Sequence, residues 1–406
     1  MLIISQKRKN LTIMLMANFL VAASATMVLP FLSLYIETFG TYSHEYVQRW
    51  SGFVFGVTFL TAFFMSPLWG RIGDRFGYKP ILLITGYGIA TSIFLMGFMH
   101  SVGGLFILRG IMGAVTGFIP TSMALISSQT PKEEAGRTLG TLQMGTVSGG
   151  LFGPVIGGLL ADNVGFSYTF IFTSIAIATA ATVVLFGIDE QRSREQRDQR
   201  NKYSSKEVLQ HIFSHKLLVT VLILSCLIQV ANFSIQPLLA LYVDELTSSS
   251  NLAFLAGIAF SATGFGNLIA TRRWGKLGDD IGYEKVLSIL LVLASIFIVP
   301  QALAVELWQL VLFRFLFGIA IGGMIPCVTA YIRQEAPLSM QGEVLGYNQS
   351  FRFLGNVIGP VFGGVVSGYI GISSVFYVTG ALFLGAFGLL WWSIHHSETT
   401  SHVKDY

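Results

Sequence analysis

The sequence predicts an all-α integral membrane protein whose twelve transmembrane helices form two repeats of six. Three observations predict this class. Apolar residues make up 53% of the 406-residue chain and charged residues only 11%, whereas soluble proteins average about 25% charged residues. Twelve apolar stretches are long enough to cross about 30 Å of hydrocarbon as helices, and the second half of the chain repeats the first.

The twelve expected spans are separated by short connections, except after the sixth. They cover residues 11–38, 49–70, 79–99, 102–128, 137–162, 166–188, 216–244, 251–272, 284–304, 307–332, 342–368 and 373–395. The first span follows a short basic segment and continues through Pro30 to Glu37. Because a cleaved signal peptide would have a shorter apolar core and a small-residue cleavage site, we expect this span to be retained.

A long polar stretch, Asp189 to His215, divides the chain. Its mixed charge is typical of a solvated linker that includes a surface helix. We therefore expect an N-terminal six-helix bundle at residues 1–188, a cytoplasmic linker at residues 189–215, and a C-terminal six-helix bundle with a short cytoplasmic tail at residues 216–406.

Basic residues predict the orientation, because short cytoplasmic connections collect Lys and Arg. With the N-terminus inside, the outside connections hold only Arg49. The inside segments hold Lys7, Arg8, Lys9, Arg71, Arg75, Lys79, Lys132, Arg137, the basic residues from Arg192 to Lys216, Arg272, Arg273, Lys276, Lys285, Arg333 and Lys404. Both termini are therefore expected in the cytoplasm. This topology accounts for the pI near 9.0, so we infer no nucleic-acid partner.

The sequence offers little for enzymatic chemistry. Cys226 and Cys327 both lie inside expected spans, which excludes a disulfide framework and a CxxC metal site. The histidines fall in connections, the linker or the tail, and no Walker-type phosphate loop is present. We expect no enzyme activity, no cofactor and no metal.

The two halves match residue by residue. A shift of 205 places Trp69 on Trp274, Asp74 on Asp279, Gly77 on Gly282 and Arg109 on Arg314; a shift of 206 places Gly153 and Pro154 on Gly359 and Pro360; and a shift of 207 places Pro30, Tyr35 and Glu37 on Pro237, Tyr242 and Asp244. Six spans per half make these parallel repeats, which predicts a substrate site between the halves.

The connection between spans two and three carries glycines, an acid and bases at fixed spacing. Gly70, Asp74, Arg75, Gly77 and Lys79 resemble the loop signature of the major facilitator superfamily, and Gly275 and Asp279 belong to its second copy. Glycines permit a sharp turn, and the acid can cap a helix or pair with a base. We expect a conformational latch here; the alternative is a topological turn.

Span five carries closely spaced glycines around a proline. Gly149, Gly153, Pro154, Gly157 and Gly158 resemble the motif associated with antiporters in this superfamily, and Gly359 and Pro360 belong to a second copy in span eleven. Small residues at a spacing of four let helices approach closely, and proline bends a helix. The resemblance implies that this contact seals the substrate cavity against proton leak; the alternative is simple helix packing.

Candidates for proton coupling are few. Arg109, in span four, resembles the buried arginine of the superfamily that is thought to tune proton transfer; the alternative is a structural anchor. The carboxylate candidates are Glu37, Asp244 and Asp162 near the outer ends of their spans and Asp74 inside. Some drug antiporters have a buried acid in the first span, and this sequence has none in the middle of that span.

Polar side chains interrupt three apolar spans. Asn348, Arg352 and Asn356 lie along one face of span eleven, Gln229, Asn232 and Gln236 along one face of span seven, and Asn18 in span one. These residues line a substrate cavity or, alternatively, form hydrogen bonds between helices.

Over essentially its whole length the chain resembles the twelve-helix drug:proton antiporter group of this superfamily, most closely multidrug efflux proteins of the MdtG and PmrA type. The resemblance implies a monomeric transporter of the plasma membrane that exports amphipathic fluoroquinolone- or dye-like drugs in exchange for protons. The competing hypotheses are a proton-coupled symporter that imports a sugar or another metabolite, and a sensor on the same fold.

Overall fold

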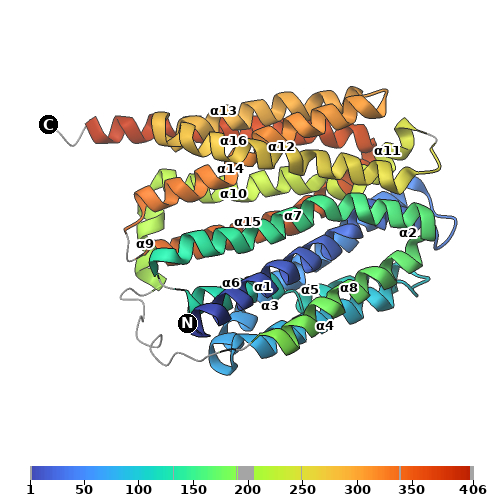
Figure 1. The fold of residues 1–406 in the computed structure, drawn as a ribbon. Helices are drawn as coiled ribbons and strands as arrows, with labels where there is room; N and C mark the ends of the chain where they lie inside the picture. The colour runs from blue at the N-terminus through green and yellow to red at the C-terminus, as the bar shows by residue number, and fades with distance from the viewer. Residues whose placement is uncertain are drawn as a thin grey trace. The chain divides into compact units, whose positions relative to one another are not determined.

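A computed structural model describes residues 2–130, 132–188, 190, 205–247, 249–337 and 340–402 (Figure 1). The described residues are almost all helical. The elements are α1 (Leu2–Met27), η1 (Leu29–Phe31), α2 (Leu32–Glu37), α3 (His44–Phe76), α4 (Tyr78–Met96), α5 (Val102–Ala114), α6 (Phe118–Gln129), α7 (Lys132–Val164), α8 (Phe166–Gly187), α9 (Ser205–Ser214), α10 (Lys216–Ser234), η3 (Gln236–Leu238), α11 (Leu239–Leu246), α12 (Leu252–Ile281), α13 (Tyr283–Ile298), η4 (Val299–Leu303), α14 (Leu307–Glu335), α15 (Gln341–Ile370) and α16 (Ile372–His402).

Twelve helical stretches of the described chain are long and apolar enough to cross a membrane. Each coincides with one of the spans expected from the sequence, which confirms the predicted fold class. The first and seventh stretches are interrupted: α1 and α2 flank the 3₁₀ turn η1 with Pro30, and α10 and α11 flank η3 with Pro237. Since proline cannot donate a backbone hydrogen bond, both interruptions have the same cause.

The turns between helices repeat as the sequence does. Among the described residues, positive φ occurs only at Gly77 (101°), Gly165 (90°), Gly282 (98°) and Gly371 (87°). Gly77 and Gly282 occupy matched positions in the two repeats, between α3 and α4 and between α12 and α13. Gly165 and Gly371 are matched in the same way, between α7 and α8 and between α15 and α16. Glycine is required at each position because a side chain disfavours this backbone conformation.

Two indole hydrogen bonds give further evidence of the repeat. Trp69 Nε1 donates to the carbonyl oxygen of Ala114 at 2.8 Å. Trp274 Nε1 donates to that of Ile319, also at 2.8 Å. Both partners of the second bond follow those of the first by the same sequence shift, so the two repeats pack their second and fourth spans in the same way.

Contacts between residues divide the chain into two compact units, Met1–Arg197 with Leu239–Ser261, and Asp198–Leu238 with Ala262–Tyr406. In the first unit, α11 contacts α2 and η1. Helix α12 begins in the first unit and ends in the second. The division of the two bundles at the linker therefore stays a prediction from the sequence.

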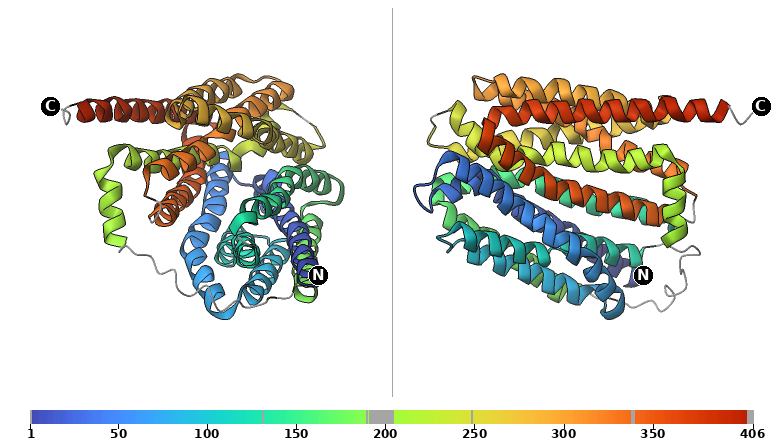
Figure 2. Two further views of the ribbon diagram at one scale, coloured as in Figure 1. Left: turned by 60° about the vertical axis from the view of Figure 1, so that its left-hand side comes forward. Right: turned by 180° about the vertical axis from the view of Figure 1, so that it is seen from behind.

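Part of the linker forms the expected surface helix, α9, which lies across the end of α10 (Figure 2). Its apolar side chains Val208 and Ile212 are 1% and 3% exposed. The helix is therefore held to the second unit by burial of one apolar face. Residues 189 and 191–204 of the linker lie outside the described chain.

Candidate functional site

The glycines of span five place α7 directly against α1. A Cβ atom at any of four α7 positions would overlap a backbone carbonyl oxygen of α1. The pairs are Gly145 with Leu15, Gly149 with Phe19, Gly153 with Ala23, and Gly157 with Met27. We call this contact the α1–α7 seam. Both helices contribute every fourth residue, so the seam has a period close to one helical turn.

The second repeat contains the same arrangement between α15 and α10. A Cβ atom at Gly355, Gly359 or Gly363 would overlap the carbonyl oxygen of Cys226, Val230 or Ser234, respectively, or come within 2.8 Å of it. We call this contact the α10–α15 seam. The sequence analysis singled out glycines of both seams, among them Gly149, Gly153, Gly157 and Gly359, but not Gly145 and not the helices that these glycines contact.

The outer end of α7 meets the start of α12. Asp162 accepts hydrogen bonds from the backbone N–H groups of Ala253 at 3.1 Å and Phe254 at 2.8 Å. The carboxylate therefore caps the N-terminus of α12, where free N–H groups favour a negative charge. Asp162 was one of the carboxylates considered for proton coupling, and this capping contact was not expected.

Close packing between α7 and α12 continues from this cap toward the middle of the two helices. A Cβ atom at Gly158 would overlap the carbonyl oxygen of Ala253, and one at Gly257 would overlap that of Pro154. One turn further, Ser261 Oγ donates to the carbonyl oxygen of Leu151 at 2.6 Å. Neither Gly257 nor Ser261 was singled out from the sequence.

The expected latch of the first repeat is held by a residue of the linker. Glu190 accepts hydrogen bonds from the backbone N–H groups of Tyr78 at 2.7 Å and Lys79 at 3.0 Å, and Lys79 Nζ donates to the carbonyl oxygen of Ile188 at 2.7 Å. The carboxylate thus caps α4 directly after the turn at Gly77. Sequence reasoning missed this role, because Glu190 lies more than 100 residues from the helix that it caps.

The other latch residues of this loop have fewer neighbours. Gly70 has open space where a Cβ atom would lie. Arg75 is exposed and places its guanidinium carbon 5.1 Å from the centroid of the Phe76 ring. The side chain of Asp74 lies outside the described residues, so its expected pairing stays a prediction.

In the second copy of the loop, the acid pairs with a residue of the same loop. Asp279 accepts a hydrogen bond from the hydroxyl of Tyr283 one turn later, and Gly275 has open space at its Cβ position. The acid therefore pairs within its own loop, whereas the first copy takes its cap from the linker.

Arg109 lies deep in the first unit with 3% of its surface exposed. Its Nε donates to the carbonyl oxygen of Val54 at 3.4 Å, its Nη1 lies 3.8 Å from the sulfur of Met112, and its Cζ lies 5.5 Å from the centroid of the Phe55 ring. Among the described residues no carboxylate pairs with it. A buried charge with weak partners is a functional candidate. Arg314, its counterpart, is also 3% exposed.

The polar stripes of spans seven and eleven contact each other. Gln229 Nε2 donates to Asn356 Oδ1 at 2.8 Å, and Ser225 Oγ donates to Asn348 Oδ1 at 2.5 Å. These contacts add hydrogen bonds to the α10–α15 seam. They match the alternative in which polar residues join two helices.

Two of the remaining polar candidates, Arg352 and Asn18, have side-chain atoms without a hydrogen-bond partner among the described residues. Arg352 is half-buried and donates to Gln349 Oε1 at 3.0 Å, while its Nε has no partner in the described chain. Asn18 is fully buried, and neither polar atom of its side chain is hydrogen-bonded to another described residue. Asn232 and Gln236 are half-buried.

Glu37 and Asp244, the matched carboxylates of spans one and seven, both belong to the first unit. Glu37 is half-buried at the end of α2 and Asp244 is exposed on α11. Glu37 lies within electrostatic range of both Asp244 and His44. The structure therefore brings together two carboxylates that the sequence related only by the repeat.

Twelve apolar spans in two repeats, with helices joined through glycine contacts and with buried polar side chains, define a membrane transporter rather than an enzyme. The family model described as Major Facilitator Superfamily matches residues 14–271 and 253–405. The chain belongs to this superfamily, which confirms the family predicted from the sequence.

Relatives cover nearly the whole chain. It is 60% identical to the uncharacterized MFS-type transporter YuxJ of Bacillus subtilis over 93% of this chain and 96% of that protein. It is 40% identical to the multidrug resistance protein MdtG of Enterobacter lignolyticus over 93% of this chain and 90% of that one. A solved structure of a bacterial homolog of the human lysosomal transporter Spinster has the same fold, with a TM-score of 0.79, 13% identity and coverage of 96% and 97% of the two chains.

Proposed function

We propose that this transporter exports amphipathic drugs across the plasma membrane in exchange for protons, by alternating access. The observation that carries the proposal is the pair of glycine seams, which occurs in both repeats and extends from α7 onto α12. Its sequence signature is the one associated with antiporters in this superfamily. The relatives named multidrug resistance protein MdtG, at 37% and 40% identity over most of the chain, support the same function.

The seams assign different mechanical roles to the helices. A helix pair whose glycines touch the carbonyl groups of its partner cannot slide without overlap, so α1 with α7 and α10 with α15 move as rigid pairs. The contact of α7 with α12 joins the two repeats instead. We infer that the hydrogen bonds from Ala253 and Phe254 to Asp162 break and re-form during each transport cycle.

Helix α12 is suited to this role because its two parts have different partners. Its first turns lie against α7, through Gly257 and Ser261. Further along, Thr263 and Gly266 touch the backbone of α14. The same helix thus takes part in the outer contact and in the packing of the second unit.

The substrate site is proposed to use the polar groups that the helices leave available. The side-chain amide of Asn18 and Nε of Arg352 have no hydrogen-bond partner among the described residues, and Asn232 and Gln236 are partly exposed. Gln229, Asn348 and Asn356 form hydrogen bonds within the α10–α15 seam. The chain contains 33 Phe and 12 Met, which can adapt to varied amphipathic molecules.

For proton coupling we propose Glu37, with Asp244 and His44 near it, and Arg109. The carboxylate titrates and the buried guanidinium biases the local field. By the distribution of basic residues both termini face the cytoplasm, and we expect a monomer to be the working unit.

A proteoliposome assay tests this function. Inside-out vesicles receive a proton gradient of either direction, and a fluorescent dye and the internal pH are followed together. Export by antiport predicts dye uptake while protons leave the vesicle. Movement of dye and protons in the same direction would replace antiport by the symport hypothesis, and dye movement independent of the gradient would remove coupling.

A further inference from the structure

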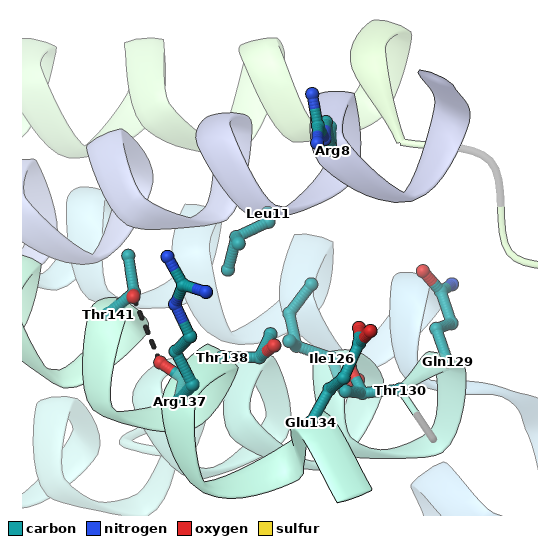
Figure 3. A pocket seen from close by; sticks show the side chains of 9 residues that line it. All are labelled: Arg8, Leu11, Ile126, Gln129, Thr130, Glu134, Arg137, Thr138 and Thr141. Atoms are coloured by element: carbon teal, nitrogen blue, oxygen red, sulfur yellow. Dashed lines mark hydrogen bonds between the residues drawn. The ribbon is translucent and has the colours of Figure 1, made fainter. Parts of the chain in front are cut away.

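A cavity of about 430 Å³ lies between the ends of three helices of the first unit (Figure 3). Arg8 lines it from α1, Thr130 from the residue after α6, and Glu134, Arg137 and Thr141 from the first turns of α7. The volume falls in the range of small-molecule sites. No step of the proposed transport cycle uses this cavity. The distribution of basic residues predicts that it faces the cytoplasm.

The cavity contains charges of both signs. Arg8 and Arg137 contribute two guanidinium groups and Glu134 contributes one carboxylate. Arg137 and Glu134 extend from α7 toward α1 (Figure 3). All three side chains are exposed, and no ion pair joins them to another residue of the described chain. Both kinds of charge therefore remain available to a ligand.

Two of the three threonines that line the cavity, Thr130 and Thr141, add acceptors rather than donors. Thr141 Oγ1 donates to the carbonyl oxygen of Arg137 at 2.9 Å, and Thr130 Oγ1 donates to that of Ile126 at 2.7 Å. Because each hydroxyl proton is already used, the oxygens offer only lone pairs to the cavity. A simple anion would find the guanidinium groups but would also meet a carboxylate and two acceptor oxygens.

We propose that this cavity binds a zwitterion. A phosphate or carboxylate of the ligand is held by Arg8 and Arg137, and its ammonium group is held by Glu134 with the threonine oxygens. Guanidinium groups bind such anions through paired, charge-assisted hydrogen bonds. Two sources have this chemistry: a phospholipid with an ethanolamine headgroup, and a soluble zwitterion from the cytoplasm. This proposal is independent of the efflux proposal, because its tests measure ligand binding and not transport.

The first arm of the test uses soluble probes on the full-length protein in detergent. Calorimetry compares glycerophosphoethanolamine, which carries both charges, with glycerol 3-phosphate and ethanolamine, which carry one each. We expect Arg137→Gln and Arg8→Gln each to raise the Kd of the zwitterion about tenfold, as loss of a charge-assisted hydrogen bond implies. Glu134→Gln should weaken the zwitterion but not glycerol 3-phosphate.

The second arm tests the lipid source. Native mass spectrometry counts lipids retained by protein taken from nanodiscs that contain phosphatidylethanolamine or phosphatidylglycerol. We expect one phosphatidylethanolamine to be retained and to be lost in Arg137→Gln. Arg272→Gln, an exposed arginine of α12 outside this cavity, is the control and should behave as wild type in both arms.

Each outcome decides the proposal. Selective binding of the soluble zwitterion supports a cytoplasmic ligand, and selective retention of phosphatidylethanolamine alone supports a lipid. Binding of glycerol 3-phosphate as tight as that of the zwitterion would overturn the assignment, and so would binding that is unchanged by Glu134→Gln. Absence of binding in both arms would overturn it as well.

Discussion

The backbone N–H of Phe254 donates a 2.8 Å hydrogen bond to the carboxylate of Asp162, which joins the start of α12 to the end of α7. A second bond, from Ala253, reaches the same carboxylate. The two helices belong to different repeats of the sequence. Their contact is therefore a candidate for the element that distinguishes the two states of an alternating-access cycle.

Replacement of Asp162 tests this role. Asp162→Ala removes two charge-assisted hydrogen bonds, each of which contributes about 1.5–3 kcal/mol. We expect the population with α7 and α12 separated to rise about tenfold or more. The measurement is the rate at which a membrane-impermeant maleimide labels Phe254→Cys in a protein without Cys226 and Cys327.

A neighbouring residue supplies the control for Asp162. Asn163 is exposed, and within the described chain its side chain donates only to the carbonyl oxygen of Leu159 in its own helix. Asn163→Ala should leave the labelling rate unchanged. Equal labelling in the two variants would show that the cap does not control the opening of this contact.

The α1–α7 seam predicts opposite outcomes for adjacent glycines. A Cβ atom at Gly149 would overlap the backbone of α1. A Cβ atom at Gly150 would have no neighbouring atom within 4 Å. Gly149→Ala should therefore destabilise the protein by about 1–3 kcal/mol through overpacking. Gly150→Ala should leave stability unchanged or raise it slightly.

Thermal unfolding in detergent, followed by fluorescence, measures both glycine variants side by side. A clear fall in the midpoint is expected for Gly149→Ala alone. Equal midpoints would mean that α1 and α7 can separate without cost, and the rigid-pair role of the seam would be lost.

The sequence predicted the features that depend on local spacing. Glycines four residues apart predict a close helix contact, and the glycine–acid–base pattern around Gly77 predicts a turn. It could not identify partners distant along the chain, such as Glu190 for the N-terminus of α4 or Gly257 for Pro154, because one sequence contains no information on pairing. Pro30 and Pro237 were matched by the repeat, yet the helix interruptions at both positions were not anticipated.

The capping of α4 by Glu190 can be tested by hydrogen exchange. Glu190→Gln weakens the acceptor of the Tyr78 and Lys79 amides and removes its charge, which should cost about 1 kcal/mol. We expect about fivefold faster exchange at these two amides. Glu335→Gln, an exposed acid at the end of α14, is the control and should leave them unchanged. Protection that survives Glu190→Ala would show that another group caps the helix.

The attachment of α9 should depend on pH. Burial, with a smaller contribution from the nearby charge of His215, lowers the pKa of His211 below its ordinary value of 6.5. Because the folded state then binds this proton less tightly than the detached helix does, attachment is at its strongest above pH 6.5 and weakens as the pH falls. Exchange at the amides of Val208 and Ile212 should be faster at pH 5.5 than expected from the intrinsic rate. His211→Gln should abolish this difference; a difference that persists would assign it to another group.

The coupling residues give a prediction about protons rather than stability. Arg109→Ala and Glu37→Gln should each keep dye binding but uncouple dye movement from the proton gradient, because one removes the buried charge and the other the titrating group. Proteoliposomes with an imposed gradient measure dye and internal pH together, and Arg272→Gln serves as the exposed-charge control. If both variants retain wild-type coupling, neither residue carries it. Coupling lost in Arg109→Ala alone would leave the proton on a carboxylate other than Glu37, with Asp244 the next to test.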